Sequence, residues 1–138
     1  MNRQLPIRVP AATARRIPTG RPRASRPQAM TKIIKRFETS NIGSLQLADL
    51  CRVAGVSERT LRTMFLEAFG MPPNRYLRTR KLFGIRAALA MAYPAHETVA
   101  SVARRFGLSD AGRMAKDYFA LFGEYPRTTL FRNVVRVR

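Results

Sequence analysis

The sequence is poor in the residue types that build catalytic, metal or disulfide sites. Its 138 residues include one cysteine, one histidine (His96) and eight acidic residues, which are scattered singly. A single cysteine excludes a disulfide framework within the chain and is typical of a reducing cytoplasm. No Asp, Glu, His and Cys residues cluster at metal-ligand spacing, so we expect no enzyme, no metal site and no cofactor.

Long apolar runs are also missing. No stretch approaches the ~20 apolar residues that are needed to cross a membrane. Positive charge, by contrast, is abundant: 26 Lys and Arg against the eight acids give a net charge of +18 and a pI near 11.8. This surplus favours a polyanionic partner, with nucleic acid first and an anionic membrane surface second.

Residues 47–70, LADLCRVAGVSERTLRTMFLEAFG, predict two short helices joined by a tight turn. The first has apolar residues at i, i+3, i+4 and i+7: Leu47, Leu50, Cys51 and Ala54. Gly55 is expected to end it, because glycine enters the left-handed region without steric cost, and Ser57 to cap the second helix. The second helix turns Leu61 and Phe65 inward and leaves polar side chains on its opening turns. This is the layout of a helix–turn–helix DNA reader.

The same pattern recurs over residues 99–123, VASVARRFGLSDAGRMAKDYFALFG. Its first helix has the same apolar spacing: Val99, Val102, Ala103 and Phe106. Gly107 and Ser109 occupy the places of the first unit's glycine and serine, 52 residues on, so Ser109 is expected to be a cap. Beyond the turn the offset becomes 53, which indicates one inserted residue at the start of the second recognition helix. A duplicated unit is a stronger signal than either copy alone.

Between the two units, residues 73–93 predict one long helix. Its apolar stripe consists of Tyr76, Leu82, Ile85, Leu89 and Ala92. About 20 residues at ~1.5 Å each span ~30 Å, close to the ~34 Å between successive major-groove faces of DNA. Gly84 weakens this helix by ~1 kcal/mol, and it serves either close packing or a small bend.

Shorter elements complete the expected fold. Residues 31–38 predict an amphipathic helix, and Pro126 begins a helix near the end of the chain. Ser44 is expected to cap the first helix of the first unit, and His96 to lie in a turn. The residues expected to fill the core beside the stripe are Cys51, Met64, Met91 and Met114.

The first 29 residues differ from the rest in composition. They hold seven arginines, five of the nine prolines and no acid, and we expect them to form a disordered basic tail. Three interpretations of the tail are open. It is a basic arm that binds phosphates or enters a minor groove of DNA, a solvated segment without a selected role, or a targeting peptide. If Met30 is the true start, the tail is an artefact of gene prediction.

From about Thr31 to Arg132 the chain resembles the DNA-binding domain of AraC/XylS-type bacterial transcription regulators. The stretches that carry the resemblance are AGVSERTLRTMFLEAFGMPPNRYLRTRKL and VASVARRFGLSD…YFALFGEYP. The resemblance implies an all-α domain of about seven helices, in which a long linker helix joins tandem helix–turn–helix subdomains. The boundaries that we expect are 30–138 for the domain, 30–72 and 94–132 for the two units, and 73–93 for the linker.

The resemblance also implies how the domain works. Such proteins place their two recognition helices in adjacent major grooves of double-stranded DNA, and most activate transcription through contact with RNA polymerase. On the first recognition helix, Arg59, Arg62 and Thr63 lie on the outward face and match the family's base-reading positions. On the second, the candidate base-reading residues are Arg113 and Lys116. Arginine can donate two parallel hydrogen bonds to guanine, although the alternative is that these residues meet phosphates only.

The second recognition helix begins with Ala111 and Gly112, which have no polar reach. The first unit is therefore expected to supply most of the sequence discrimination, and the second mostly phosphate anchoring and shape readout. Candidate contacts to the DNA backbone lie near helix starts or on polar faces, and each is otherwise an ordinary solvated side chain: Ser57, Thr60, Arg75, Arg104, Arg105, Ser109 and Arg127.

The sequence thus predicts a DNA-binding transcription regulator, an activator that is monomeric, cytoplasmic and nucleoid-associated, with no membrane and no cofactor. One alternative is a nonspecific basic binder of nucleic acid or membrane surfaces. Another is the truncated remnant of a longer regulator, whose Phe119 and Leu121 once met a lost domain. The same two residues are equally candidates for contact with RNA polymerase.

Overall fold

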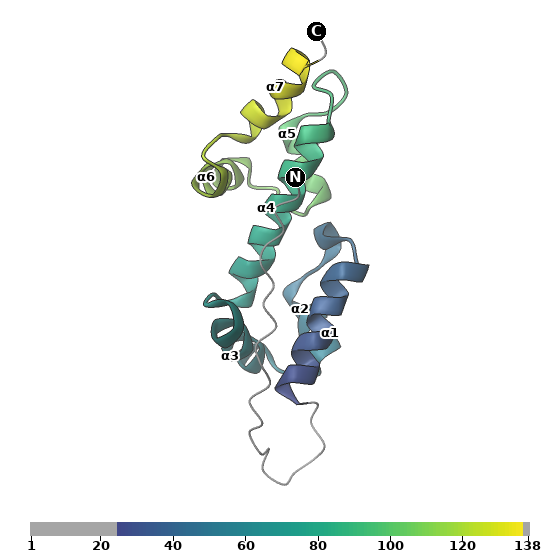
Figure 1. Cartoon of the computed structure of the whole chain (residues 1–138), viewed down its shortest axis with the longest axis vertical. Coiled ribbons are helices and arrows are strands. Elements are labelled where there is room, and N and C mark those ends of the chain that lie inside the picture. The colour runs from purple at the N-terminus through teal and green to yellow at the C-terminus, as the bar shows by residue number, and fades with distance from the viewer. Residues whose placement is uncertain (1–24, 137–138) are drawn as a thin grey trace. The chain divides into compact units, whose positions relative to one another are not determined.

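The computed structural model describes residues 25–136, in which all regular structure is helical (Figure 1). The elements, in chain order, are α1 (Arg26–Thr39), the 3-10 turn η1 (Ile42–Ser44), α2 (Leu47–Ala54), α3 (Glu58–Phe69), α4 (Pro73–Met91), α5 (Val99–Arg105), α6 (Ala111–Phe122) and α7 (Pro126–Arg136). The prediction of an all-α fold with about seven helices is confirmed. No helix among the described residues has the length and apolar character of a membrane span.

Helix α1 begins five residues earlier than the sequence predicts. Ser25 accepts a hydrogen bond from the backbone N–H of Gln28 at 3.3 Å, and the Gln28 side chain accepts one from the N–H of Ser25 in return. Pro27 lies in the first turn, and Ala29 is fully buried. The expectation that the tail reaches to residue 29 is therefore wrong for its last residues, because a capping box and buried side chains fix them. The rest of the expected tail, residues 1–24, lies outside the described residues.

The described residues divide into two compact units. The first unit contains residues 25–41 and 45–78, and the second contains residues 42–44 and 79–136. The division falls inside α4, so this one helix supplies side chains to both cores.

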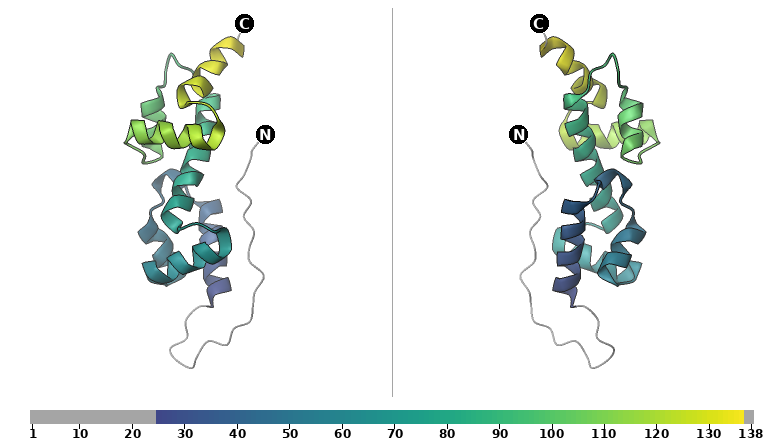
Figure 2. Two further views of the ribbon diagram at one scale, coloured as in Figure 1. Left: turned by 90° about the vertical axis from the view of Figure 1, so that its left-hand side faces the viewer. Right: turned by 90° about the vertical axis from the view of Figure 1, so that its right-hand side faces the viewer.

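In the first unit, α1, α2 and α3 surround the start of α4 (Figure 2). The ring of Tyr76 on α4 stacks on Phe69 at 4.3 Å between centroids. The same ring lies 5.4 Å from Phe65 and 5.6 Å from Phe37. We call these four residues the aromatic cluster. The other large buried side chains of this core are Met30, Ile33, Leu45, Leu50, Leu61, Met64 and Leu77.

Helix α2 ends at the glycine that the sequence predicts, but it begins with a different cap. Gly55 ends the helix with a φ of 66°, in the left-handed region that glycine enters freely. Ser44 does not cap α2, because it belongs to η1. Instead the backbone N–H of Gln46 donates to Oδ2 of Asp49 at 2.9 Å, and this carboxylate lies in the helix's first turn, where the dipole favours it.

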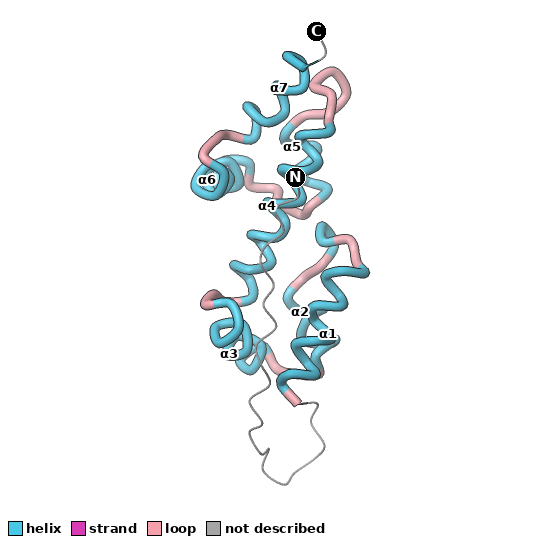
Figure 3. Tube along the Cα trace, viewed as in Figure 1, coloured by secondary structure: helices cyan, strands magenta, loops and turns pink. Residues whose placement is uncertain are grey.

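In the second unit, α5, α6 and α7 lie around the rest of α4 (Figure 3), and the core fills the space between these helices. It contains Leu82, Ile85, Leu89, Ala92, Val102, Ala103, Leu108, Met114, Tyr118 and Leu130. The apolar stripe of α4 and the core position of Met114 are confirmed. Met91 is wrong as a core residue, since 81 % of it is exposed. The stripe steps from Leu89 to Ala92, which leaves Met91 on the outer side of the helix end.

The choice left open for Gly84 is decided by its surroundings. A Cβ added there would lie 2.3 Å from an edge carbon of the Phe106 ring, so the glycine permits close packing of this ring on α4. Gly43 is similarly constrained, because its added Cβ would lie 2.3 Å from the carbonyl oxygen of Arg105.

Two smaller expectations concern single polar residues. His96 is exposed in a turn, as expected. Cys51 is half-buried on α2. Burial, and secondarily the negative charge of Glu58, raise the pKa of the Cys51 thiol, so this group stays protonated near neutral pH.

Candidate nucleic-acid interface

The first recognition helix, α3, is fixed at both ends and along its inner face. The Ser57 hydroxyl accepts from the backbone N–H of Thr60 at 3.2 Å and donates to the Thr60 hydroxyl at 3.1 Å, which confirms Ser57 as the cap. Gly70 ends the helix in the left-handed region, with a φ of 70°. Leu61 and Phe65 are fully buried. Together these contacts set which face of α3 points outward.

That outward face carries Arg59, Arg62 and Thr63, all exposed. Their spacing of i, i+3 and i+4 makes them neighbours on the helix surface. Within the part of the chain that the structure describes, neither arginine forms an ion pair. The Thr63 hydroxyl donates to the Arg59 carbonyl oxygen at 3.2 Å and still has lone pairs to accept. Helix α3 thus offers two unengaged guanidinium groups beside a hydroxyl.

The second recognition helix, α6, begins one residue later than the cap prediction requires. Asp110 is its N-cap, and Oδ1 of this residue accepts from the backbone N–H of Arg113 at 3.0 Å. The prediction of Ser109 as the cap is therefore wrong. The residue inserted before α6 shifts the start of the helix by one position, and Ser109 is left exposed in the preceding turn.

The exposed face of α6 differs in chemistry from that of α3. Arg113 and Lys116 are exposed one turn apart, next to the exposed Ala111 and Gly112. The Nε of Arg113 lies 4.0 Å from Oδ2 of Asp117 on the same helix. The only arginine on this helix therefore has a carboxylate one turn away, which partly offsets its positive charge.

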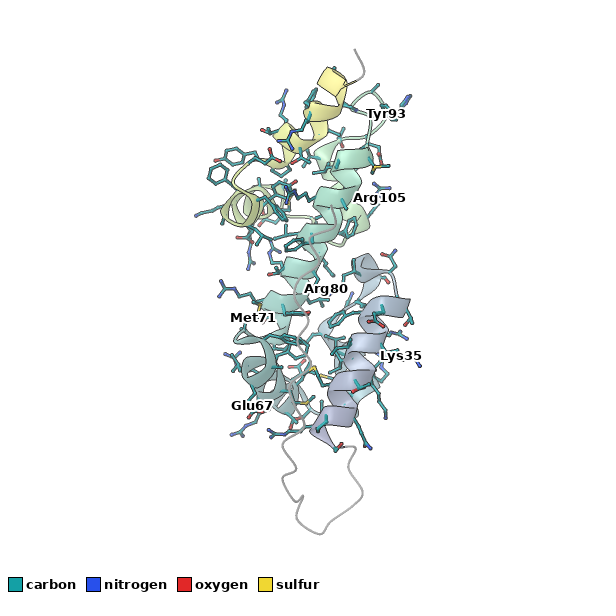
Figure 4. The ribbon with its side chains drawn as sticks, viewed as in Figure 1. Lys35, Glu67, Met71, Arg80, Tyr93 and Arg105 are labelled. Atoms are coloured by element: carbon teal, nitrogen blue, oxygen red, sulfur yellow. The ribbon has the colours of Figure 1, made fainter. Side chains whose placement is uncertain are left out.

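The candidate backbone contacts are in varied situations. The Thr60 side chain is held by Ser57, as described above. Arg105, at the end of α5 (labelled in Figure 4), pairs with Oε1 of Glu97 at 2.9 Å. The Arg127 guanidinium lies over the Phe131 ring, 5.3 Å from its centroid. The others in this group, Arg75, Arg104 and Ser109, are exposed. A phosphate-binding role for each of these residues stays a prediction.

Three acids that engage residues of the proposed interface were not predicted from the sequence: Glu97, Asp110 and Asp117. The signals were present, since Asp117 stands four residues after Arg113 and Asp110 immediately precedes α6. Among the described residues, no group of His, Cys, Asp and Glu is arranged to hold a metal ion.

Comparisons with known proteins agree with this arrangement. Residues 50–132 match a family model described as a helix–turn–helix domain. The chain is 34% identical over 99 residues to XylDLEGF operon transcriptional activator 2 of Pseudomonas putida, covering 72% of this chain and 63% of that protein. It is 32% identical over 115 residues to a probable thc operon regulatory protein of Rhodococcus erythropolis, covering 80% of this chain and 35% of that protein.

The chain therefore spans about one third to somewhat under two thirds of the length of these relatives. A solved structure with the same fold is a transcriptional regulator with an AraC-type DNA-binding domain from Chromobacterium violaceum. The TM-score is 0.63 at 22% identity, over 74% of this chain and 88% of that one.

Proposed function

The chain belongs to the AraC/XylS family, and on that basis we propose that it regulates transcription by binding specific sequences of double-stranded DNA. The observation that carries this proposal is the outward face of α3, with Arg59, Arg62 and Thr63 exposed side by side. Paired guanidinium donors on the surface of a recognition helix suit the acceptors of guanine in the major groove. The net charge of +18 adds attraction to phosphates of any sequence.

We further propose an unequal division of labour between the two recognition helices, which enter adjacent major grooves. The arginines of α3 form no ion pair with any described residue and are available for bases. On α6, Asp117 lies 4.0 Å from Arg113, and the first turn offers only Ala111 and Gly112, whose longest reach is a methyl group. Helix α3 then supplies most of the discrimination, and α6 mostly binds phosphates with Lys116.

The experiment compares Arg62→Ala with Lys116→Ala, two exposed cations on equivalent helices. The preferred site is first selected from a pool of random duplexes. Arg62→Ala should lose ~1–3 kcal/mol of preference for that site over a scrambled duplex. Lys116→Ala should weaken both duplexes alike and lower the salt dependence by about one phosphate contact. Equal loss of preference in both variants would rule out the unequal division.

The same titrations test the alternative of a nonspecific basic binder. If the selection returns no preferred sequence, and if affinity for every duplex falls together with salt, charge alone explains binding. A specific regulator keeps a large affinity ratio at moderate salt.

We propose that the chain acts as a monomeric activator on DNA of the cytoplasmic nucleoid and that it touches RNA polymerase. Support comes from the named operon activator among its relatives and from apolar side chains near the end of α6. Phe119 is 44% exposed and Leu121 40% exposed. The test is transcription by RNA polymerase from a template that carries the selected site, in the presence of either the unmodified chain or the Phe119→Ser variant. Unchanged activation by the variant would exclude this contact.

A further inference from the structure

The two units share one repeat, but they fix the corner after the recognition helix by different chemistry. In the first unit, α3 turns through Gly70 into α4, and the aromatic cluster fills the corner with the Tyr76 ring against Phe65 and Phe69. Contacts of this kind depend on apolar area and ring packing. They do not require any charged group.

In the second unit, α6 turns through Gly123 into α7. The counterpart of Tyr76, 53 residues on, is Thr129, which has no ring. The hydroxyl oxygens of Tyr118 and Thr129 are 2.7 Å apart, and Thr129 donates to Oε1 of Glu124 at 2.9 Å. A threonine hydroxyl has one proton, so Tyr118 is the donor to Thr129.

The other oxygen of the carboxylate is also engaged, since Arg132 on α7 donates to Oε2 of Glu124. We call Tyr118, Glu124, Thr129 and Arg132 the polar clasp. The Tyr118 residue is fully buried and Thr129 is 2% exposed, while 16% of the Glu124 side chain is exposed. The charged groups that act on Glu124 are Arg132 from α7 and Arg86 from α4.

Glu124 is therefore the acceptor at the end of a buried chain of hydroxyls. Without its charge, the Thr129 proton loses a strong acceptor and Arg132 loses its ion pair. The residue that corresponds to Glu124 in the first unit is Met71 (labelled in Figure 4), which cannot play this part.

We propose that Glu124 is a positioning residue that holds α7 on the end of α6. The corner after the second unit's recognition helix, and with it that helix's hold on DNA, then depends on a carboxylate, whereas the aromatic cluster fills the corner after the first unit's recognition helix. The consequence for DNA rests on the proposed function; the consequence for the fold does not.

The first test is segment-resolved hydrogen exchange of the full chain carrying Glu124→Gln, a nearly isosteric change. Amides of α6 and α7 should exchange roughly tenfold faster or more, and those of α2 and α3 at the unchanged rate. Tyr118→Phe, which removes one hydroxyl, should also accelerate exchange in α6 and α7, but by a smaller factor. Met71→Gln is the matched control and should leave α6 and α7 unchanged. No acceleration in α6 and α7, or equal acceleration in both units, would overturn the proposal.

The second test is footprinting on the selected DNA site. The half-site that loses protection in Lys116→Ala is the one that α6 contacts. Glu124→Gln should reduce protection of this half-site and preserve protection of the other. Equal loss over both halves would overturn the positioning role. If no selected site exists, the proposed function fails, while hydrogen exchange still decides whether the clasp holds α7.

Discussion

At the scale of single residues, the two glycines inside helices have opposite roles. Gly84 faces the Phe106 ring, and an added Cβ would meet it at 2.3 Å. Gly112, in the first turn of α6, has only Oδ1 of Asp110 near its own added Cβ, at 3.8 Å. Replacing glycine by alanine should therefore change the free energy of unfolding in opposite directions at the two positions.

Gly112→Ala should raise the free energy of unfolding by up to ~1 kcal/mol, because alanine loses less backbone entropy in a helix. Gly84→Ala should lower it by about 1–3 kcal/mol, since the ring must move out of a packed site. Urea unfolding followed by circular dichroism measures both. A gain at Gly84 would mean that Phe106 shifts without cost.

At the scale of elements, the start of α6 depends on one side chain. Asp110 accepts from the backbone N–H of Arg113, whereas Ser109 lies one position too early. Asp110→Ala should cost ~0.5–2 kcal/mol of stability, and Ser109→Ala should cost almost nothing. Thermal unfolding of the two variants measures the difference. A larger loss of stability from Ser109→Ala than from Asp110→Ala would show that Ser109 caps α6, as the repeat predicts.

The corner between α6 and α7 should respond to acid. Burial of Glu124 alone would raise the pKa of its carboxyl group. Hydrogen bonds from Arg132 and Thr129, and the positive charges of Arg132 and Arg86, outweigh burial, so the pKa is lowered overall. A carboxyl group whose pKa is lower in the folded state stabilises the fold above its unfolded pKa. That stability is lost as the pH falls through the lowered value.

The melting temperature of the chain should therefore fall between about pH 5 and pH 3, with a contribution from Glu124. In Glu124→Gln this part of the fall should be absent, because glutamine does not titrate. Calorimetric scans of both proteins across this range measure the difference. Parallel curves for the two proteins would show that Glu124 has the same pKa in the folded and unfolded states.

At the scale of the whole molecule, α4 supplies residues to both cores as one helix of 19 residues, or ~28 Å. If this helix keeps the two recognition helices at a fixed separation, the DNA site must have a fixed spacing. Inserting about 5 bp between its halves turns one groove to the far side of the duplex. Affinity should then fall to that of a single half-site, as measured by gel shift, and unchanged affinity would exclude the fixed separation.

Much of the fold followed from the sequence because its signals are local. Apolar spacing placed α2 to α6 within a few residues, and Gly55 and Ser57 marked helix ends through backbone conformation and a hydrogen bond three residues away. Helical spacing also predicted which residues face outward on α3. The base-reading role of those residues is still a prediction, since it depends on DNA.

What the tertiary structure alone decided concerns partners that are distant in sequence. The ring of Phe106 explains Gly84, and the burial of Ala29 extends α1. The polar clasp belongs here as well, because its bonds form only when α7 folds back on α6. Periodicity records which side of a helix is apolar, but the side chain that meets it is chosen by packing in three dimensions.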